Sequence, residues 1–116
     1  YEAIGSPNLG ANFDIGHAMA EGGFGDWQIT ARLIAPHTKM MAVKDFVWDK
    51  NKPKWVPLGE GIVPIAAFLR IMRADGFAGP ISMHFEYKVP SDEALLAEVR
   101  KAAVTLRAAL SEAGYS

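Results

Sequence analysis

Six residues with acidic, basic or metal-binding side chains lie at or just after the ends of three short apolar segments. They are Asp14, His17, Lys44, Asp45, His84 and Glu86. Carboxylates and imidazoles bind divalent metal ions and transfer protons, and an ammonium group stabilises negative charge that develops on a substrate oxygen. These residue types point to metal-assisted or acid–base chemistry if the fold brings the three segment ends together.

The first two pairs each leave two interpretations open. Asp14 and His17 can supply a metal ligand and a second ligand or proton carrier, or Asp14 can cap a loop beside a surface histidine. Lys44 can act as an electrophile near a sugar oxygen with Asp45 as its carboxylate partner. Alternatively, these two residues form an ordinary ion pair at a strand terminus.

The third pair, His84 and Glu86, has the spacing of residues on one side of a strand. If that side faces the interior of a barrel, both residues can reach a metal ion or a substrate. The alternative is a pair that faces the covering helices, which would bury a glutamate without a partner at a high cost in free energy. The spacing therefore favours a site role for both residues.

The segment 48–55 combines two tryptophans with three lysines, and we expect it to be a polar loop. Interleaved basic and aromatic side chains can bind nucleic acid or stack on a sugar ring, so Trp48 is a candidate substrate-binding residue. A solvated loop with tryptophan anchors is the alternative. His37 follows Pro36 in a connection, where a structural or exposed role is expected.

The elements that must position these residues form three strand-then-helix units. The expected strands cover residues 9–14, 39–45 and 80–86, and the expected helices cover residues 26–33, 64–76 and 90–114. Helical spacing of apolar residues and terminal signals define the helices. The first strand is followed by a stretch that is expected to be irregular because of its glycines, Gly22, Gly23 and Gly25.

The last expected helix has a signal at each end and an apolar stripe between them. Ser91 is a suitable N-cap, and Gly114 is a suitable C-terminal stop. The stripe consists of Leu95, Leu96, Val99, Ala103, Leu106 and Leu110. A stripe of this kind predicts that one side of the helix packs on the core.

Alternating strands and helices imply an α/β fold with a parallel sheet and right-handed crossovers. The first strand–helix connection lacks the G-x-G-x-x-G pattern, which disfavours a dinucleotide-binding fold. In a closed barrel, the C-terminal ends of the strands converge on one active-site face. We therefore predict one domain, residues 1–116, that forms part of a (β/α)8 barrel, with units at about 1–37, 38–76 and 77–116.

Composition excludes several classes of protein. The chain has 116 residues and a formal net charge of −1, which argues against general nucleic-acid binding. It has no cysteine, so disulfides and thiolate metal sites are excluded, and a cytoplasmic location is expected. No apolar run reaches the roughly 18 residues of a membrane span. The first residue is not methionine, which hints that the chain starts inside a longer protein.

Four motifs follow the order found in the xylose-isomerase-like TIM barrels. Residues 12–17 (NFDIGH) resemble the D-T-G-H strand end of that family, and residues 43–45 resemble the end of its H-x-K-D strand. Residues 57–61 (PLGEG) are similar to its P-L-G-E-G loop, and residues 76–82 resemble the G-Y-x-G-x-[IV]-S segment before its last strand. The order and spacing of these motifs make the resemblance specific for the superfamily.

The resemblance implies strands six to eight of a barrel of about 250 residues, with the earlier strands missing. It also implies a divalent metal ion (Mn, Mg, Zn or Co), with Asp14 as a ligand and His17 in contact with substrate. The family's strand-seven histidine falls at Ala42, and its last-strand glutamate falls at His84. Either His84 completes a rearranged metal site, or the site has lost its metal.

Three functions follow. The leading one is the C-terminal part of a metal-dependent sugar or sugar phosphate isomerase or epimerase. Its expected catalytic residues are Glu86 and Lys44, its substrate-binding residues are His17, Lys44 and Trp48, and its metal ligands are Asp14 and His84.

The second is a non-catalytic barrel fragment that self-associates, because an open sheet exposes two edges. A homo-oligomer or a missing N-terminal half-barrel would cover those edges, and the chain alone would lack a complete active site. The third is a DNA repair barrel similar to the apurinic endonucleases. The presence of only three histidines and the net charge of −1 disfavour it.

Overall fold

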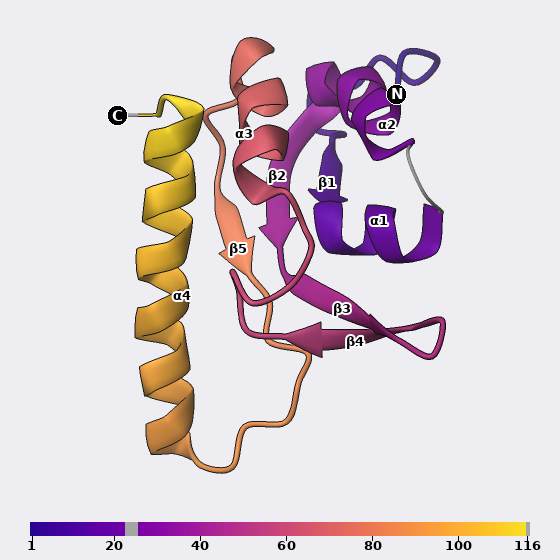
Figure 1. The fold of residues 1–116 in the computed structure, drawn as a ribbon. Helices are drawn as coiled ribbons and strands as arrows, with labels where there is room; N and C mark the ends of the chain where they lie inside the picture. The colour runs from indigo at the N-terminus through magenta and orange to yellow at the C-terminus, as the bar shows by residue number, and fades with distance from the viewer. Residues whose placement is uncertain (23–25, 116) are drawn as a thin grey trace.

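A parallel sheet forms the centre of the protein. The structure, a computed structural model, describes residues 1–22 and 26–115. Strands β1 (Ala11–Asp14), β2 (Thr38–Val43) and β5 (Ile81–Met83) pair in the order β1–β2–β5, and both pairings are parallel. Figure 1 shows that all three strands run toward the same end of the molecule. The predicted α/β fold with a parallel sheet is confirmed.

Four α-helices accompany the sheet in the described part of the chain. They are α1 (Ile15–Gly22), α2 (Trp27–Ile34), α3 (Ile65–Ala74) and α4 (Asp92–Ala113), and a 3-10 turn, η1 (Ala35–His37), follows α2. Helix α3 packs between α2 and α4 (Figure 1). None of the described helices has the length and hydropathy needed to cross a membrane.

The core lies between the sheet and these helices. Phe13, Met41 and Val43 project from the strands into it, and Phe68 and Met72 project from α3. The rings of Phe13 and Phe68 stack with centroids 5.4 Å apart. Because side chains alternate along a strand, the residues between these core positions project from the opposite face of the sheet.

The first strand–helix connection differs from the prediction. Helix α1 begins at Ile15, directly after β1, and includes Gly22 as its last residue. The prediction of irregular structure at Gly22 was therefore wrong, while Gly23 and Gly25 lie outside the described residues. Ile15 is fully buried and Met19 packs against the core, so tertiary packing stabilises a helix that the glycines obscured in the sequence.

The segment predicted as a polar loop forms a β-hairpin instead. Strands β3 (Asp45–Asp49) and β4 (Lys52–Val56) pair antiparallel. Lys50 and Asn51 connect them with φ values of 49° and 64°, as a two-residue turn that follows the strand twist requires. The hairpin lies across the end of the molecule toward which the three parallel strands run (Figure 1).

The apolar stripe of α4 is buried only in part. Leu106 is buried, whereas Leu95, Leu96 and Val99 have 39%, 59% and 36% of their surface exposed. The first turns of α4 extend past the sheet (Figure 1), so the described chain leaves this part of the stripe uncovered.

The hydroxyl of Tyr87 gives stability a pH dependence. It donates a 2.7 Å hydrogen bond to Glu98 Oε2 on α4. Burial, this hydrogen bond and the nearby negative charges of Glu98 and Glu60 all raise the pKa of Tyr87 above its ordinary value of 10.0. Because the pKa is higher in the folded chain than in the unfolded one, the associated stability is fully present below about pH 10 and is lost at higher pH.

We therefore expect the Tyr87→Phe variant to lose less thermal stability than the wild-type chain between about pH 9 and about pH 12. Melting temperatures measured across this range would test the expectation. Equal slopes for the two proteins would contradict it.

Candidate functional site

Five of the six predicted site residues meet at the C-terminal ends of β1, β2 and β5. Asp14 ends β1, Lys44 directly follows β2, and His84 directly follows β5. The backbone of His84 donates a 3.0 Å hydrogen bond to the carbonyl of Val43, so the chain after β5 stays beside the end of β2. We call the following set the polar cluster: Asp14, His17, Lys44, His84 and Glu86.

Lys44 is the centre of the polar cluster. Its Nζ atom lies 2.5 Å from Glu86 Oε1 and 3.2 Å from Asp14 Oδ2. The same ammonium lies 4.5 Å from the centroid of the Trp55 ring, at the range of a cation–π contact. Only 2% of the Lys44 side chain is exposed, against 39% for Glu86. The cluster therefore combines a buried cation with a carboxylate that solvent can reach.

His84 faces both carboxylates. Its Nδ1 atom lies 3.6 Å from Asp14 Oδ2 and 4.0 Å from Glu86 Oε1. Its other ring nitrogen, Nε2, lies 3.1 Å from the hydroxyl of Ser82, which orients the ring. The period-two spacing of Ser82, His84 and Glu86 thus places all three on the side of the sheet that faces the cluster.

His17 approaches Glu86 from α1. Its Nε2 atom lies 3.9 Å from Glu86 Oε1, and its backbone N–H donates a 3.1 Å hydrogen bond to Asp14 Oδ1. The Nδ1 atom lies 2.7 Å from Glu21 Oε1, at an angle that makes no hydrogen bond. The ring also meets Trp55 edge to face, with centroids 5.4 Å apart. Both imidazoles therefore present one nitrogen toward Glu86.

Asp45 has a structural role, and the prediction that it is the carboxylate partner of Lys44 was wrong. Its buried carboxylate accepts hydrogen bonds of 2.9 to 3.0 Å from four backbone N–H groups. The donors are those of Phe46, Gly59, Gly61 and Val63. The carboxylate thereby ties the segment 57–63 to the start of β3. In the same segment, Glu60 pairs with Lys101 of α4.

Trp55, rather than Trp48, is the tryptophan at the polar cluster. Trp48 lies further along the hairpin, meets the Phe46 ring at 5.1 Å and is 36% exposed. Its predicted role in substrate binding stays a prediction. Trp55 was not predicted as a site residue because the segment was expected to be a loop, whereas the hairpin register places Trp55 opposite Phe46.

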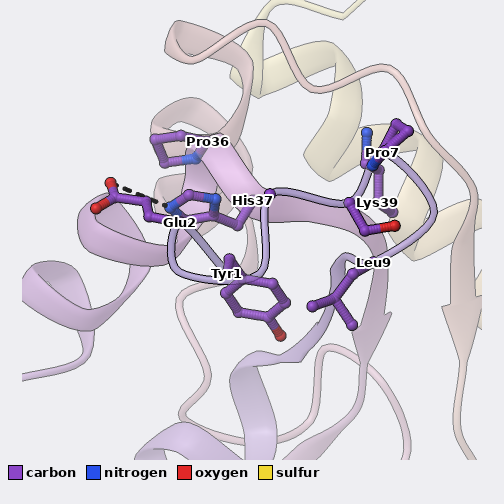
Figure 2. Close-up of a pocket in the computed structure, with 9 residues that line it drawn as sticks. Tyr1, Glu2, Pro7, Leu9, Pro36, His37 and Lys39 are labelled. Carbon is purple, nitrogen blue, oxygen red and sulfur yellow. Dashed lines mark ion pairs between the residues drawn. The ribbon is translucent and has the colours of Figure 1, made fainter.

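A pocket of about 270 Å³ lies at the opposite ends of the strands. Its lining includes Leu9, just before β1, His37, the last residue of η1, and Lys39, the second residue of β2. Figure 2 shows His37 between Tyr1 and Glu2, and the rings of Tyr1 and His37 stack at 5.2 Å. The third histidine therefore lies away from the polar cluster, at the opposite edge of the sheet.

The residues of the polar cluster do not by themselves form a site for a divalent metal ion. The predicted ligands Asp14 and His84 are close, but the ammonium of Lys44 lies 3.2 Å from the same Asp14 oxygen that faces His84. Ala42, on the neighbouring strand, is fully buried and supplies no donor. Within residues 1–22 and 26–115, no three histidine, aspartate or glutamate side chains are grouped to hold a metal.

A sequence profile of the xylose isomerase-like TIM barrels matches residues 1–108. The chain belongs to this family. No curated protein matches it by sequence.

Two solved members resemble the chain at moderate identity. One is a xylose isomerase domain protein from Alicyclobacillus acidocaldarius, with 25% identity, a TM-score of 0.74, and coverage of 97% of this chain and 40% of that protein. The other, from Planctomyces limnophilus, has 26% identity, a TM-score of 0.74, and coverage of 96% and 41%. The chain thus spans about two fifths of their length, so the predicted partial barrel agrees with both.

Two more distant structures show the fold alone. One is a xylose isomerase-like TIM barrel protein from Mycobacterium smegmatis, solved in complex with magnesium, with 17% identity and a TM-score of 0.68. The match covers 94% of this chain and 38% of that protein. An L-ribulose 3-epimerase is 18% identical with a TM-score of 0.60, covering 97% and 41%.

Proposed function

We propose that this chain supplies part of the active site of a sugar isomerase or epimerase. The observation that carries the proposal is the contact between the Glu86 carboxylate and the buried Lys44 ammonium, at the C-terminal edge of the sheet. Active sites of TIM barrels lie at this edge. The family membership and a structural neighbour that is an L-ribulose 3-epimerase support a sugar or sugar phosphate as the substrate.

The proposed chemistry is proton transfer next to a carbonyl group. Glu86 removes a proton from the carbon beside the carbonyl, and the electron pair of that C–H bond forms an enediolate. Lys44 stabilises the negative charge on the enediolate oxygen. Return of the proton to the neighbouring carbon, with transfer of the enediolate hydroxyl proton to the former carbonyl oxygen, isomerises the sugar. Protonation of the original carbon by a second group on its opposite face epimerises it.

The other members of the polar cluster have supporting roles in this proposal. Asp14 provides a second carboxylate contact, at 3.2 Å, that holds the ammonium of Lys44 in place. His17 and His84 are half-exposed, and each presents a ring nitrogen within 4.0 Å of Glu86. They are placed to bind substrate hydroxyl groups or to pass protons to and from the carboxylate.

We also propose that β1, β2 and β5 are strands six, seven and eight of a barrel. Further strands outside these 116 residues would complete that barrel. The support for this proposal is exposed apolar surface on both flanks. Ile29 and Leu33 of α2 are 60% and 73% exposed, and Leu96 and Val104 of α4 are 59% and 66% exposed. The same surface favours self-association as a second candidate property of the chain.

The test of the catalytic proposal is exchange of substrate protons with solvent. The complete barrel that contains this sequence would be incubated in D2O with ketoses and aldoses, with and without a phosphate group. We expect deuterium to replace hydrogen beside the carbonyl of at least one sugar, as followed by NMR. Absence of exchange and of product across all sugars would contradict the proposal.

A further inference from the structure

Lys44 occupies the place of a cation between two carboxylates. Its Nζ atom lies 2.5 Å from Glu86 Oε1 and 3.2 Å from Asp14 Oδ2, which are charge-assisted contacts from two different strand ends. The ammonium is almost wholly buried, and the Trp55 ring covers another side of it. A side chain held on three sides is a fixed part of the site.

The residues around Lys44 offer few ligands for a metal ion in addition to the ammonium. In the register of the sheet, Ala42 lies between Asp14 on β1 and Ser82 on β5. Its position is therefore next to the polar cluster. It is fully buried and has no donor atom. The imidazole nitrogens that face the two carboxylates from the described residues are those of His84, 3.6 Å from Asp14 Oδ2, and His17, 3.9 Å from Glu86 Oε1.

We propose that the Lys44 ammonium takes the place of a divalent metal ion in this site, so that the chain binds no such ion at the polar cluster. A divalent ion between Asp14 and Glu86 would lie next to the ammonium, and the repulsion between the two cations would oppose its binding. The ammonium supplies the positive charge that the carboxylates need and that a developing oxyanion would use.

The catalytic meaning of this inference rests on the proposed function, whereas its binding test does not. Removal of the ammonium would leave the carboxylates of Asp14 and Glu86 without a positive charge between them, with His84 Nδ1 3.6 Å from Asp14 Oδ2 and 4.0 Å from Glu86 Oε1, so that small side-chain movements would bring the three donors onto one ion. Carboxylate oxygens with one imidazole form a donor set that Mn²⁺ accepts. The inference therefore predicts that the loss of one lysine creates metal binding.

The experiment measures Mn²⁺ binding to the complete barrel that contains this sequence, by electron paramagnetic resonance of the free ion. We expect the wild-type barrel to bind Mn²⁺ more weakly than about 1 mM. We expect the Lys44→Met variant to bind at least about tenfold more tightly, and the double variant Lys44→Met, Asp14→Asn to lose this gain. Stoichiometric Mn²⁺ binding by the wild-type barrel, or equal affinity of Lys44→Met and wild type, would overturn the inference.

If the Lys44→Met variant does not fold, a comparison of Mn²⁺ binding by wild type and by Asp14→Asn still tests the proposal. The Asp14→Asn and wild-type barrels would be titrated with Mn²⁺ side by side. We expect the same weak binding in both, because Asp14 is engaged by Lys44. A drop in affinity on Asp14→Asn substitution would show that the carboxylate holds the metal and would refute the proposal. None of these readouts depends on sugar turnover, so a failure of the proposed function would be seen separately.

Discussion

Replacement of Asp45 by asparagine should lower the free energy of unfolding of the chain by about 3 kcal/mol. The carboxylate is 2% exposed and accepts four backbone hydrogen bonds. An asparagine amide keeps only one accepting oxygen, and its NH2 group would face N–H donors. At least one backbone donor would then lie buried without an acceptor, and each such group costs about 1 to 3 kcal/mol. Urea denaturation followed by circular dichroism would measure the loss.

A matched control is available on the same strand. Asp49 ends β3 and is exposed, so Asp49→Asn should change the unfolding free energy by less than about 0.5 kcal/mol. Gly61→Ala provides a second perturbation of the same contact, because a β-carbon at Gly61 would lie 2.1 Å from Asp45 Oδ1. We expect this variant to be destabilised as well. A loss below about 1 kcal/mol for Asp45→Asn would show that the carboxylate does not hold the segment 57–63.

The convergence of the strand ends was predictable from the sequence because it follows from topology. Parallel strands joined by helices must end at one edge, so residues that follow the strands meet there. Asp14, Lys44 and His84 could be assigned to that edge from position alone. The caps of α4 were also readable: Ser91 accepts a 3.2 Å hydrogen bond from the N–H of Ala94, and Gly114 has a φ of 89°.

The partner of each charge was not predictable in the same way. Lys44 and Asp45 are adjacent in sequence, yet Lys44 pairs with Glu86, 42 residues away, and Asp45 binds backbone groups of the segment 57–63. Both contacts depend on how loops pack after the strands end. Sequence periodicity carries no information about such packing, because the partners of these two residues, Glu86 and the segment 57–63, lie outside the helices and strands.

The hairpin and the exposed stripe of α4 escaped prediction for two other reasons. The turn at Lys50 and Asn51 lacks the glycine that most often marks a two-residue hairpin. Without that signal, the lysines of the segment were interpreted as a polar loop. The apolar residues at the start of α4 suggested a core contact that the described chain does not provide, since Leu96 is 59% exposed. A stripe shows that a surface needs a partner and does not show whether this chain contains it.

Glu86→Gln should reduce kcat/KM for the proposed sugar isomerisation or epimerisation by about 10³-fold, within the range that loss of a general base produces. Glutamine keeps the size of the side chain and can still contact Lys44, but it cannot accept the substrate proton. Loss of solvent deuterium incorporation should accompany the loss of turnover, because both depend on the same proton transfer. The measurement is parallel kinetics and NMR exchange on the complete barrel.

The control for this variant is Glu112→Gln, the same chemical change at an exposed residue of α4 that pairs with Arg70. We expect it to retain wild-type kcat/KM and exchange. If Glu86→Gln keeps turnover within about threefold of wild type, another group removes the proton. The two imidazoles that present a nitrogen within 4.0 Å of Glu86, those of His17 and His84, would then be the next bases to replace. Loss of activity in one of these variants alone would reassign the proton transfer to that side of the cluster.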